Sequence, residues 1–159
     1  MRIEEILKKN CIINNLVADS KENALWQMAE KLYHLGYVKK TFIQAIQDRE
    51  AKYPSGLPMK GHKIAIPHTD AKYVNASVIC FAKLKSPVTF SIMGDPSQSI
   101  QVQMISMFAL KEKKEIGNLL EILITSYQDN DMLTSLLDAQ DEQEMYSILH
   151  KSIGKYIKV

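Results

Sequence analysis

One histidine stands where a folded chain could present it for chemistry. His68 follows the apolar segment 64–66 and Pro67, a pattern that predicts a short strand ending at the proline. Because proline restricts the backbone that enters His68, we expect the imidazole to be held in place rather than mobile. A neutral imidazole can attack phosphorus or act as a general base. The alternative is that His68 only ends the strand and bonds a carbonyl oxygen.

Arg49 is the second candidate for chemistry. It lies three and four residues beyond Ile46 and Ala45, on the apolar face of a predicted helix that starts at Thr41. From this face its guanidinium could offer several donors to a phosphate. The alternative is a surface arginine that interacts with the carboxyl end of its own helix or pairs with Glu50.

The loop between Arg49 and His68 contains a serine and a glycine suited to anion binding. Ser55 and Gly56 follow Pro54 and could supply a hydroxyl and backbone N–H groups, although a plain turn would use the same residues. The loop has neither the GxxxxGK[ST] spacing of a P-loop nor the GxGxxG spacing of a dinucleotide site.

The other histidines and the cysteines predict no metal site and no cofactor. His62 lies in the same loop and could reach the site, but His62 and His68 lack the HExxH spacing and no cysteine cluster accompanies them. Cys11 and Cys80 are far apart in the sequence and are expected to be two buried thiols. A GxSxG hydrolase elbow and the paired carboxylates of a glycosidase are also missing from the sequence.

Hydrophobic periodicity predicts helices on both sides of a central group of strands. A helix is expected after a cap at Asp19 or Ser20 and before Gly36, another from Thr41 with Gln44 in a capping box, and an outer one over residues 1–9. Three more are expected over 116–127, from Asn130 and from Asp141. The predicted strands are 11–14, 63–67, 77–84, 88–91 and 100–110. The segment 78–82 is apolar at every position, so both faces of its strand should be covered. The expected fold is therefore an α/β sandwich of three layers with a mixed, mainly five-stranded sheet.

Length and composition predict one ordinary globular domain over residues 1–159. The chain has a net charge of +2 with neutral histidines and 46% hydrophobic residues, which argues against both a nucleic-acid-binding protein and a disordered chain. No apolar run reaches the length of a membrane helix, and Glu4 and Glu5 lie where a signal peptide would be apolar. We therefore expect a cytoplasmic protein.

Three segments together resemble a known family. Arg49-Glu50, the segment 53–57 (Tyr-Pro-Ser-Gly-Leu) and the segment 64–68 (Ile-Ala-Ile-Pro-His) are similar to the EIIA component of the bacterial phosphoenolpyruvate-dependent sugar phosphotransferase system, in the type 2 or fructose–mannitol group. The form of segment 53–57 resembles the galactitol branch. The resemblance extends over most of the chain.

This resemblance implies a phosphoryl carrier. His68 would accept a phosphoryl group on Nε2 from the phosphohistidine of HPr and pass it to a cysteine of EIIB, while the membrane component EIIC transports the sugar. Arg49 would neutralise the phosphoryl group. Ser55 and backbone N–H groups near Gly56 would line the pocket, with Glu50, Pro67, Thr69 and His62 as further lining residues.

The chain departs from the family pattern at one position, and two functions other than a phosphoryl carrier are also open. Many type 2 members carry a second histidine near the start of the helix after the long strand, where this chain has Glu115 within the segment 113–116. The same fold could instead serve as a regulatory module that binds proteins according to its phosphorylation state. Outside the family, an α/β ligand-binding module would leave His68 with a structural role.

Overall fold

The computed structural model describes residues 1–157. Its elements in chain order are α1 (Ile3–Ile6), β1 (Leu7–Leu16), α2 (Lys21–His34), α3 (Thr41–Lys52), β2 (Ile64–Ala65), the 3-10 helix η1 (Ala71–Tyr73), β3 (Val78–Ile92), β4 (Asp95–Ala109), α4 (Lys113–Tyr127), α5 (Asn130–Asp138) and α6 (Glu142–Gly154). Within the described range, no helix is both long enough and apolar enough to cross a bilayer.

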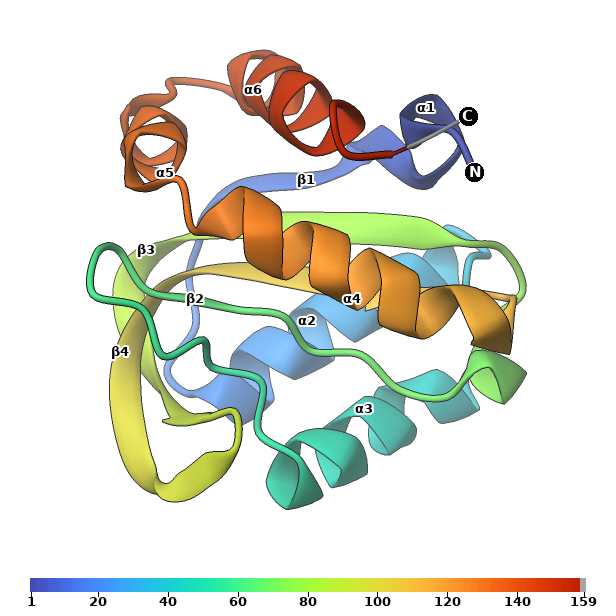
Figure 1. Ribbon diagram of the computed structural model, residues 1–159. Coiled ribbons are helices and arrows are strands. Elements are labelled where there is room, and N and C mark those ends of the chain that lie inside the picture. Colours follow the sequence, from blue (N-terminus) through green and yellow to red (C-terminus); the bar gives the residue numbers. More distant parts are fainter. Residues whose placement is uncertain (158–159) are drawn as a thin grey trace.

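The sheet is mixed and has four strands in the order β1-β3-β4-β2 (Figure 1). β1 pairs with β3 and β2 pairs with β4 in parallel, whereas β3 and β4 are antiparallel. The prediction of five strands was wrong, because segments 77–84 and 88–91 belong to the single strand β3. A register shift between Lys83 and Val88 takes up the residues between them, and the pairing to β4 resumes at Val88.

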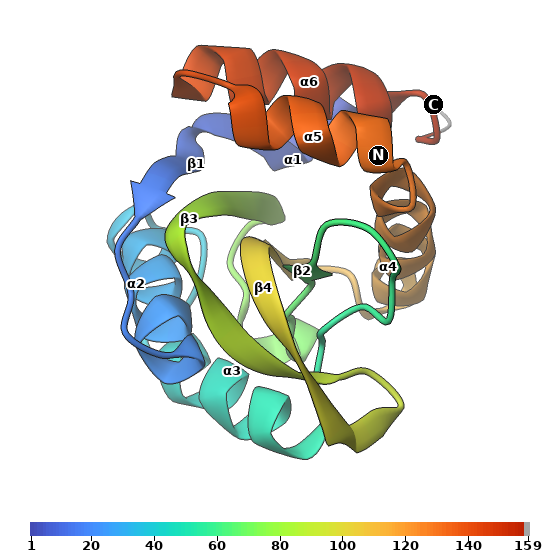
Figure 2. The ribbon, with the colours of Figure 1, turned by 90° about the vertical axis from the view of Figure 1, so that its left-hand side faces the viewer.

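Each face of the sheet has its own core, so the prediction of covered faces is confirmed. Cys80 and Ala82 of β3 pack on the side of α2 and α3, whereas Ile79 and Phe81 pack on the side of α4, α5 and α6. Figures 1 and 2 show these two helical layers on opposite sides of the sheet. Cys11 and Cys80 are both buried and unpaired, as expected.

The caps at Ser20 and Asp141 are confirmed, and α3 begins at Thr41 as predicted, but the capping box predicted there is wrong. Ser20 accepts a hydrogen bond from Asn23 N–H, and Asp141 accepts one from Glu144 N–H. Thr41 is the first residue of α3 rather than its cap, because Lys40 precedes the helix and no side chain caps it.

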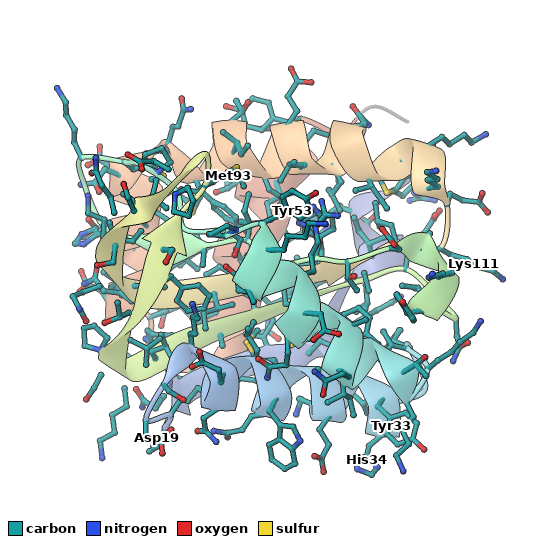
Figure 3. The ribbon with its side chains drawn as sticks, turned by 90° about the horizontal axis from the view of Figure 1, so that it is seen from below. Asp19, Tyr33, His34, Tyr53, Met93 and Lys111 are labelled. Carbon is teal, nitrogen blue, oxygen red and sulfur yellow. The ribbon has the colours of Figure 1, made fainter. Side chains whose placement is uncertain are left out.

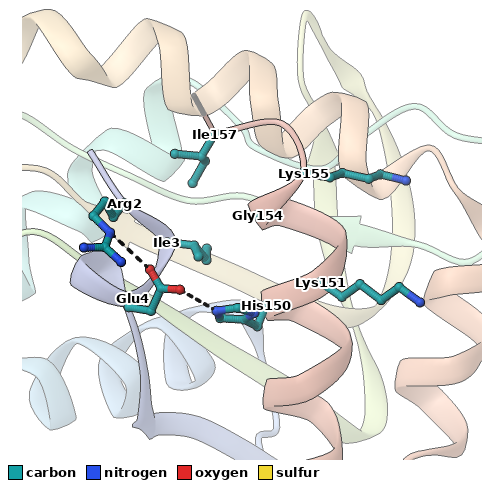
Figure 4. A pocket seen from close by; sticks show the side chains of 8 residues that line it. All are labelled: Arg2, Ile3, Glu4, His150, Lys151, Gly154, Lys155 and Ile157. Carbon is teal, nitrogen blue, oxygen red and sulfur yellow. Dashed lines mark hydrogen bonds and ion pairs between the residues drawn. The ribbon is translucent and has the colours of Figure 1, made fainter. Parts of the chain in front are cut away.

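The outer helix expected over residues 1–9 is reduced to α1, and its apolar residues Ile3 and Ile6 are buried. From Leu7 the chain runs as β1, because pairing with β3 overrides the helical pattern. The His150 ring lies 2.9 Å from Glu4 Oε1 and connects this N-terminal turn to α6 (Figure 4). That hydrogen bond from His150 is the main reason that the pKa of the Glu4 carboxyl is lowered.

A buried lysine connects the sheet to α5. Lys83 of β3 is 7% exposed, and its Nζ donates to the carbonyl oxygens of Leu136, Leu137 and Ala139 at 3.3, 3.2 and 2.6 Å. These carbonyls lie at the C-terminal end of α5, where helical partners run out and a positive charge is favourable. The lysine therefore fixes the end of α5 above β3.

Candidate active site

His68 is held by two contacts that leave one ring nitrogen free. Its Nδ1 lies 3.1 Å from the carbonyl oxygen of Ile66, and its ring stacks on Phe108 of β4, with 4.6 Å between centroids and 16° between planes. A carbonyl oxygen can only accept, so Nδ1 must carry the ring proton. The lone pair of the neutral ring is consequently on Nε2, which makes Nε2 the nucleophilic atom.

The backbone on either side of His68 is fixed by β4. Pro67 O accepts a hydrogen bond of 3.1 Å from Phe108 N–H, and β2 just before it pairs with Met104 and Ile105. Pro67 and Thr69 are both buried. Pro67 and Thr69 are therefore part of the buried backbone on either side of His68.

The surroundings of His68 favour the neutral ring. Burial lowers the pKa of the imidazole below its ordinary value of 6.5, and the Arg49 charge lowers it further, whereas the hydrogen bond to Ile66 and the Asp70 carboxylate raise it. Burial is the largest of these effects. Near pH 7 the ring is thus available as a nucleophile.

Arg49 has a buried donor with no partner. Its guanidinium carbon lies 4.5 Å from the centroid of the Tyr53 ring, which is 53% exposed at the C-terminal end of α3 (Figure 3). This cation–π contact orients the side chain. Among the described residues, nothing accepts a hydrogen bond from the buried Arg49 Nε. An unpaired buried donor is costly, and a phosphoryl oxygen would satisfy it.

Ser55 lies inside the fold, where both its donors are engaged. Its N–H and its hydroxyl donate to the two carboxylate oxygens of Glu50 at 2.7 and 2.6 Å. The exposed fractions are 2% for Ser55 and 3% for Glu50. Burial raises the pKa of the Glu50 carboxyl to about 7, against the opposing effect of the two bonds from Ser55. Direct donation from Ser55 to a phosphoryl group would require these bonds to open.

Gly56 is required by close packing. Its N–H donates to Ser91 O at 3.1 Å, and its carbonyl accepts from Met93 N–H at 2.7 Å. A Cβ at this position would lie 2.6 Å from Ser91 O, a distance that only glycine avoids without a backbone shift. Its N–H is therefore also engaged within the scaffold.

His62 and Glu115 have their contacts elsewhere. The His62 ring lies 2.9 Å from Thr134 Oγ1, and its N–H donates to Asn130 Oδ1, so it attaches the loop to α5. Glu115 lines a pocket formed with residues such as Met1 and Tyr156.

The segment that follows His68 has a different neighbour on α4. A groove of about 610 Å³ is lined by Asp70, Ala71, Lys72, Lys113, Ile116 and Gly117. Lys113 and Gly117, rather than Glu115, therefore face this segment. The sequence analysis missed both this groove and Phe108; for Phe108 the only signal was its position in an apolar strand.

Comparisons with known proteins identify the family of this chain. Residues 5–152 match the family model of the phosphoenolpyruvate-dependent sugar phosphotransferase system, EIIA 2. The chain belongs to this family. It is 25% identical over 123 residues to the galactitol-specific EIIA component of Escherichia coli K12, covering 77% of this chain and 81% of the relative.

Two solved structures share the EIIA fold. IIA mannitol from Escherichia coli has a TM-score of 0.72 at 24% identity, covering 89% of this chain and 96% of that one. The complex of enzyme IIA mannitol with phosphorylated enzyme IIB mannitol, also from Escherichia coli, gives a TM-score of 0.74 at 22% identity over 92% of this chain and 99% of that one.

The perturbed imidazole can be tested by NMR titration. We expect the ring resonances of His68 to titrate with a midpoint below 6.5, and those of the urea-unfolded chain to titrate near the ordinary value. Because the folded state disfavours the charged ring, the unfolded chain binds the proton first as the pH falls through 6.5. Protonation of this group therefore lowers the free energy of unfolding until the pH falls below the folded-state pKa. A folded-state midpoint at or above 6.5 would show that burial is not the main effect on the pKa of the His68 ring.

Proposed function

We propose that this protein is a phosphoryl carrier whose Nε2 atom of His68 accepts a phosphoryl group from the phosphohistidine of HPr and passes it to a cysteine of EIIB. The observation that carries this proposal is the bond from His68 Nδ1 to Ile66 O, which leaves Nε2 as the nucleophile. The unpaired Nε of Arg49 supplies a donor for the transferred group.

The geometry suits both halves of the transfer. When Nε2 of His68 attacks, a new P–N bond forms while the P–N bond to the donor histidine breaks and its electron pair returns to that ring. His68 keeps its Nδ1 proton and becomes cationic, and the Ile66 carbonyl stabilises this charge. When a cysteine thiolate attacks, the P–S bond forms and His68 leaves as a neutral imidazole.

The protein contributes position and charge more than acid–base chemistry. Stacking on Phe108 and the bond to Ile66 hold the ring in one orientation for in-line attack. Arg49 stabilises the negative charge that is spread over the phosphoryl oxygens. The pocket does not need to activate water, and exclusion of water protects the phosphoryl group from hydrolysis.

The galactitol-specific relative supports uptake of galactitol or a related polyol. The structure of the mannitol enzyme with phosphorylated enzyme IIB supports EIIB as the acceptor. In this function the protein works in the cytoplasm, and a membrane EIIC selects the sugar.

Phosphorylation by the general components tests the proposal. Incubation with phosphoenolpyruvate, enzyme I and HPr is expected to add one acid-labile phosphate, seen by intact mass, and His68→Gln is expected to abolish it. His62→Gln is the matched control, because this histidine lies in the same part of the chain but bonds Thr134. No phosphate on the wild type, or equal labelling of His68→Gln, would contradict the carrier function.

Replacement of Arg49 tests its role in transfer. We expect Arg49→Met to slow phosphorylation of His68 roughly 100-fold while the fold is retained, since one donor to the developing charge is lost. Lys52→Met is a close control, because Lys52 Nζ lies 5.4 Å from the centroid of the same Tyr53 ring and carries the same charge. Equal rates for both variants, measured by rapid quench, would exclude a specific role for Arg49.

A further inference from the structure

A continuous series of hydrogen bonds runs from a buried carboxylate to the reactive histidine. Glu50 accepts from the N–H and the hydroxyl of Ser55. The carbonyl of Ser55 accepts from Ile66 N–H at 3.1 Å. The carbonyl of Ile66 then accepts from His68 Nδ1 at 3.1 Å. Two residues therefore separate the Glu50 carboxylate from the imidazole.

The middle of this series is a short antiparallel ladder between segments 55–57 and 64–66. Leu57 N–H donates to Ile64 O at 3.0 Å, next to the bond between Ile66 and Ser55, and Gly56 bridges Ala65. The ladder is only a few residues long, and residues 58–63 form the loop that connects its two segments. Its first residue is secured to α3 by Glu50, five residues earlier in the chain.

The cost of burying Glu50 indicates that its position matters. A carboxyl group with 3% exposure loses most of its hydration, and its hydrogen-bonding partners are both on Ser55. It makes no ion pair within the described residues. The carboxylate holds Ser55 in segment 55–57. That segment pairs with segment 64–66, whose Ile66 carbonyl accepts from His68.

We propose that Glu50 is a positioning residue for phosphoryl transfer, which acts through Ser55 and Ile66 to hold the His68 ring with its proton on Nδ1. This inference rests on the phosphoryl-carrier function proposed above. Without the carboxylate, the N–H and hydroxyl of Ser55 lose their acceptors, the ladder loosens, and Ile66 O no longer selects one tautomer. A ring that carries its proton on Nε2 presents no lone pair to the incoming phosphorus.

Three variants separate this role from a general loss of stability. Glu50→Ala removes both acceptors, Ser55→Ala removes only the hydroxyl bond, and Glu50→Gln can still accept from Ser55 N–H and donate to its hydroxyl. Lys83→Met is the control, because it removes a buried, hydrogen-bonded charge that caps α5 and is absent from the series.

Two readouts are measured on each variant. The first is the tautomer of His68 in the unphosphorylated protein, from the ¹⁵N shifts of its two ring nitrogens. The second is the rate of phosphorylation by phospho-HPr. We expect Glu50→Ala to show mixed tautomers and at least a 10-fold slower rate, Ser55→Ala an intermediate loss, and Glu50→Gln a rate within about threefold of the wild type. Lys83→Met should keep the Nδ1–H tautomer and the wild-type rate.

A single Nδ1–H tautomer and an unchanged rate in folded Glu50→Ala would overturn the proposal. If Glu50→Ala does not fold, Ser55→Ala decides: an intermediate change supports the series, and behaviour equal to Lys83→Met overturns it. The tautomer is read without phosphate, so absence of labelling in the wild type would refute the carrier function while the positioning role is still decided by the ¹⁵N shifts.

Discussion

The hydrogen bond between His68 Nδ1 and the Ile66 carbonyl is the interaction on which the site depends. It assigns the ring proton to one nitrogen and so makes the other the nucleophile. It also opposes the lowering of the imidazole pKa by burial, so the same bond would stabilise the cationic ring that the proposed phosphorylation of Nε2 would form. In the proposed transfer, one backbone carbonyl would thus serve both the attack and the product.

The fold around this bond is arranged to keep that carbonyl in place. β4 supports it from one side, because Phe108 stacks on the ring and its N–H bonds Pro67 O. The ladder to segment 55–57 supports it from the other side. Because Phe108 lies near the end of β4, and β4 pairs with β3 along most of its length, the ring rests on an interior strand of the sheet. Among the described residues, Arg49 Nε is a buried side-chain donor without a partner, and the transferred group would bring it an acceptor.

Much of this arrangement could be predicted from local patterns. Each of the correct predictions depends on residues close together in the sequence. Pro67 fixes the backbone next to it, Arg49 follows the apolar positions of its own helix, and the caps at Ser20 and Asp141 adjoin the helices that they begin. The single strand β3 could not be predicted, because only the pairing with β4 shows that the ladder resumes at Val88 after the register shift. The bond between Glu50 and Ser55 was also missed, since it depends on how α3 ends and the chain turns back. From the sequence, Ser55 suits anion binding as well as it suits the bond to Glu50 that the structure shows.

The most direct test of this account is to identify which nitrogen of His68 carries the phosphoryl group. Protein labelled with ¹⁵N in its histidine rings is phosphorylated, and the one-bond coupling between ³¹P and ¹⁵N is measured by NMR. We expect the coupling at Nε2, with the proton retained on Nδ1. A coupling at Nδ1 would contradict the account, because that atom is occupied by the bond to Ile66.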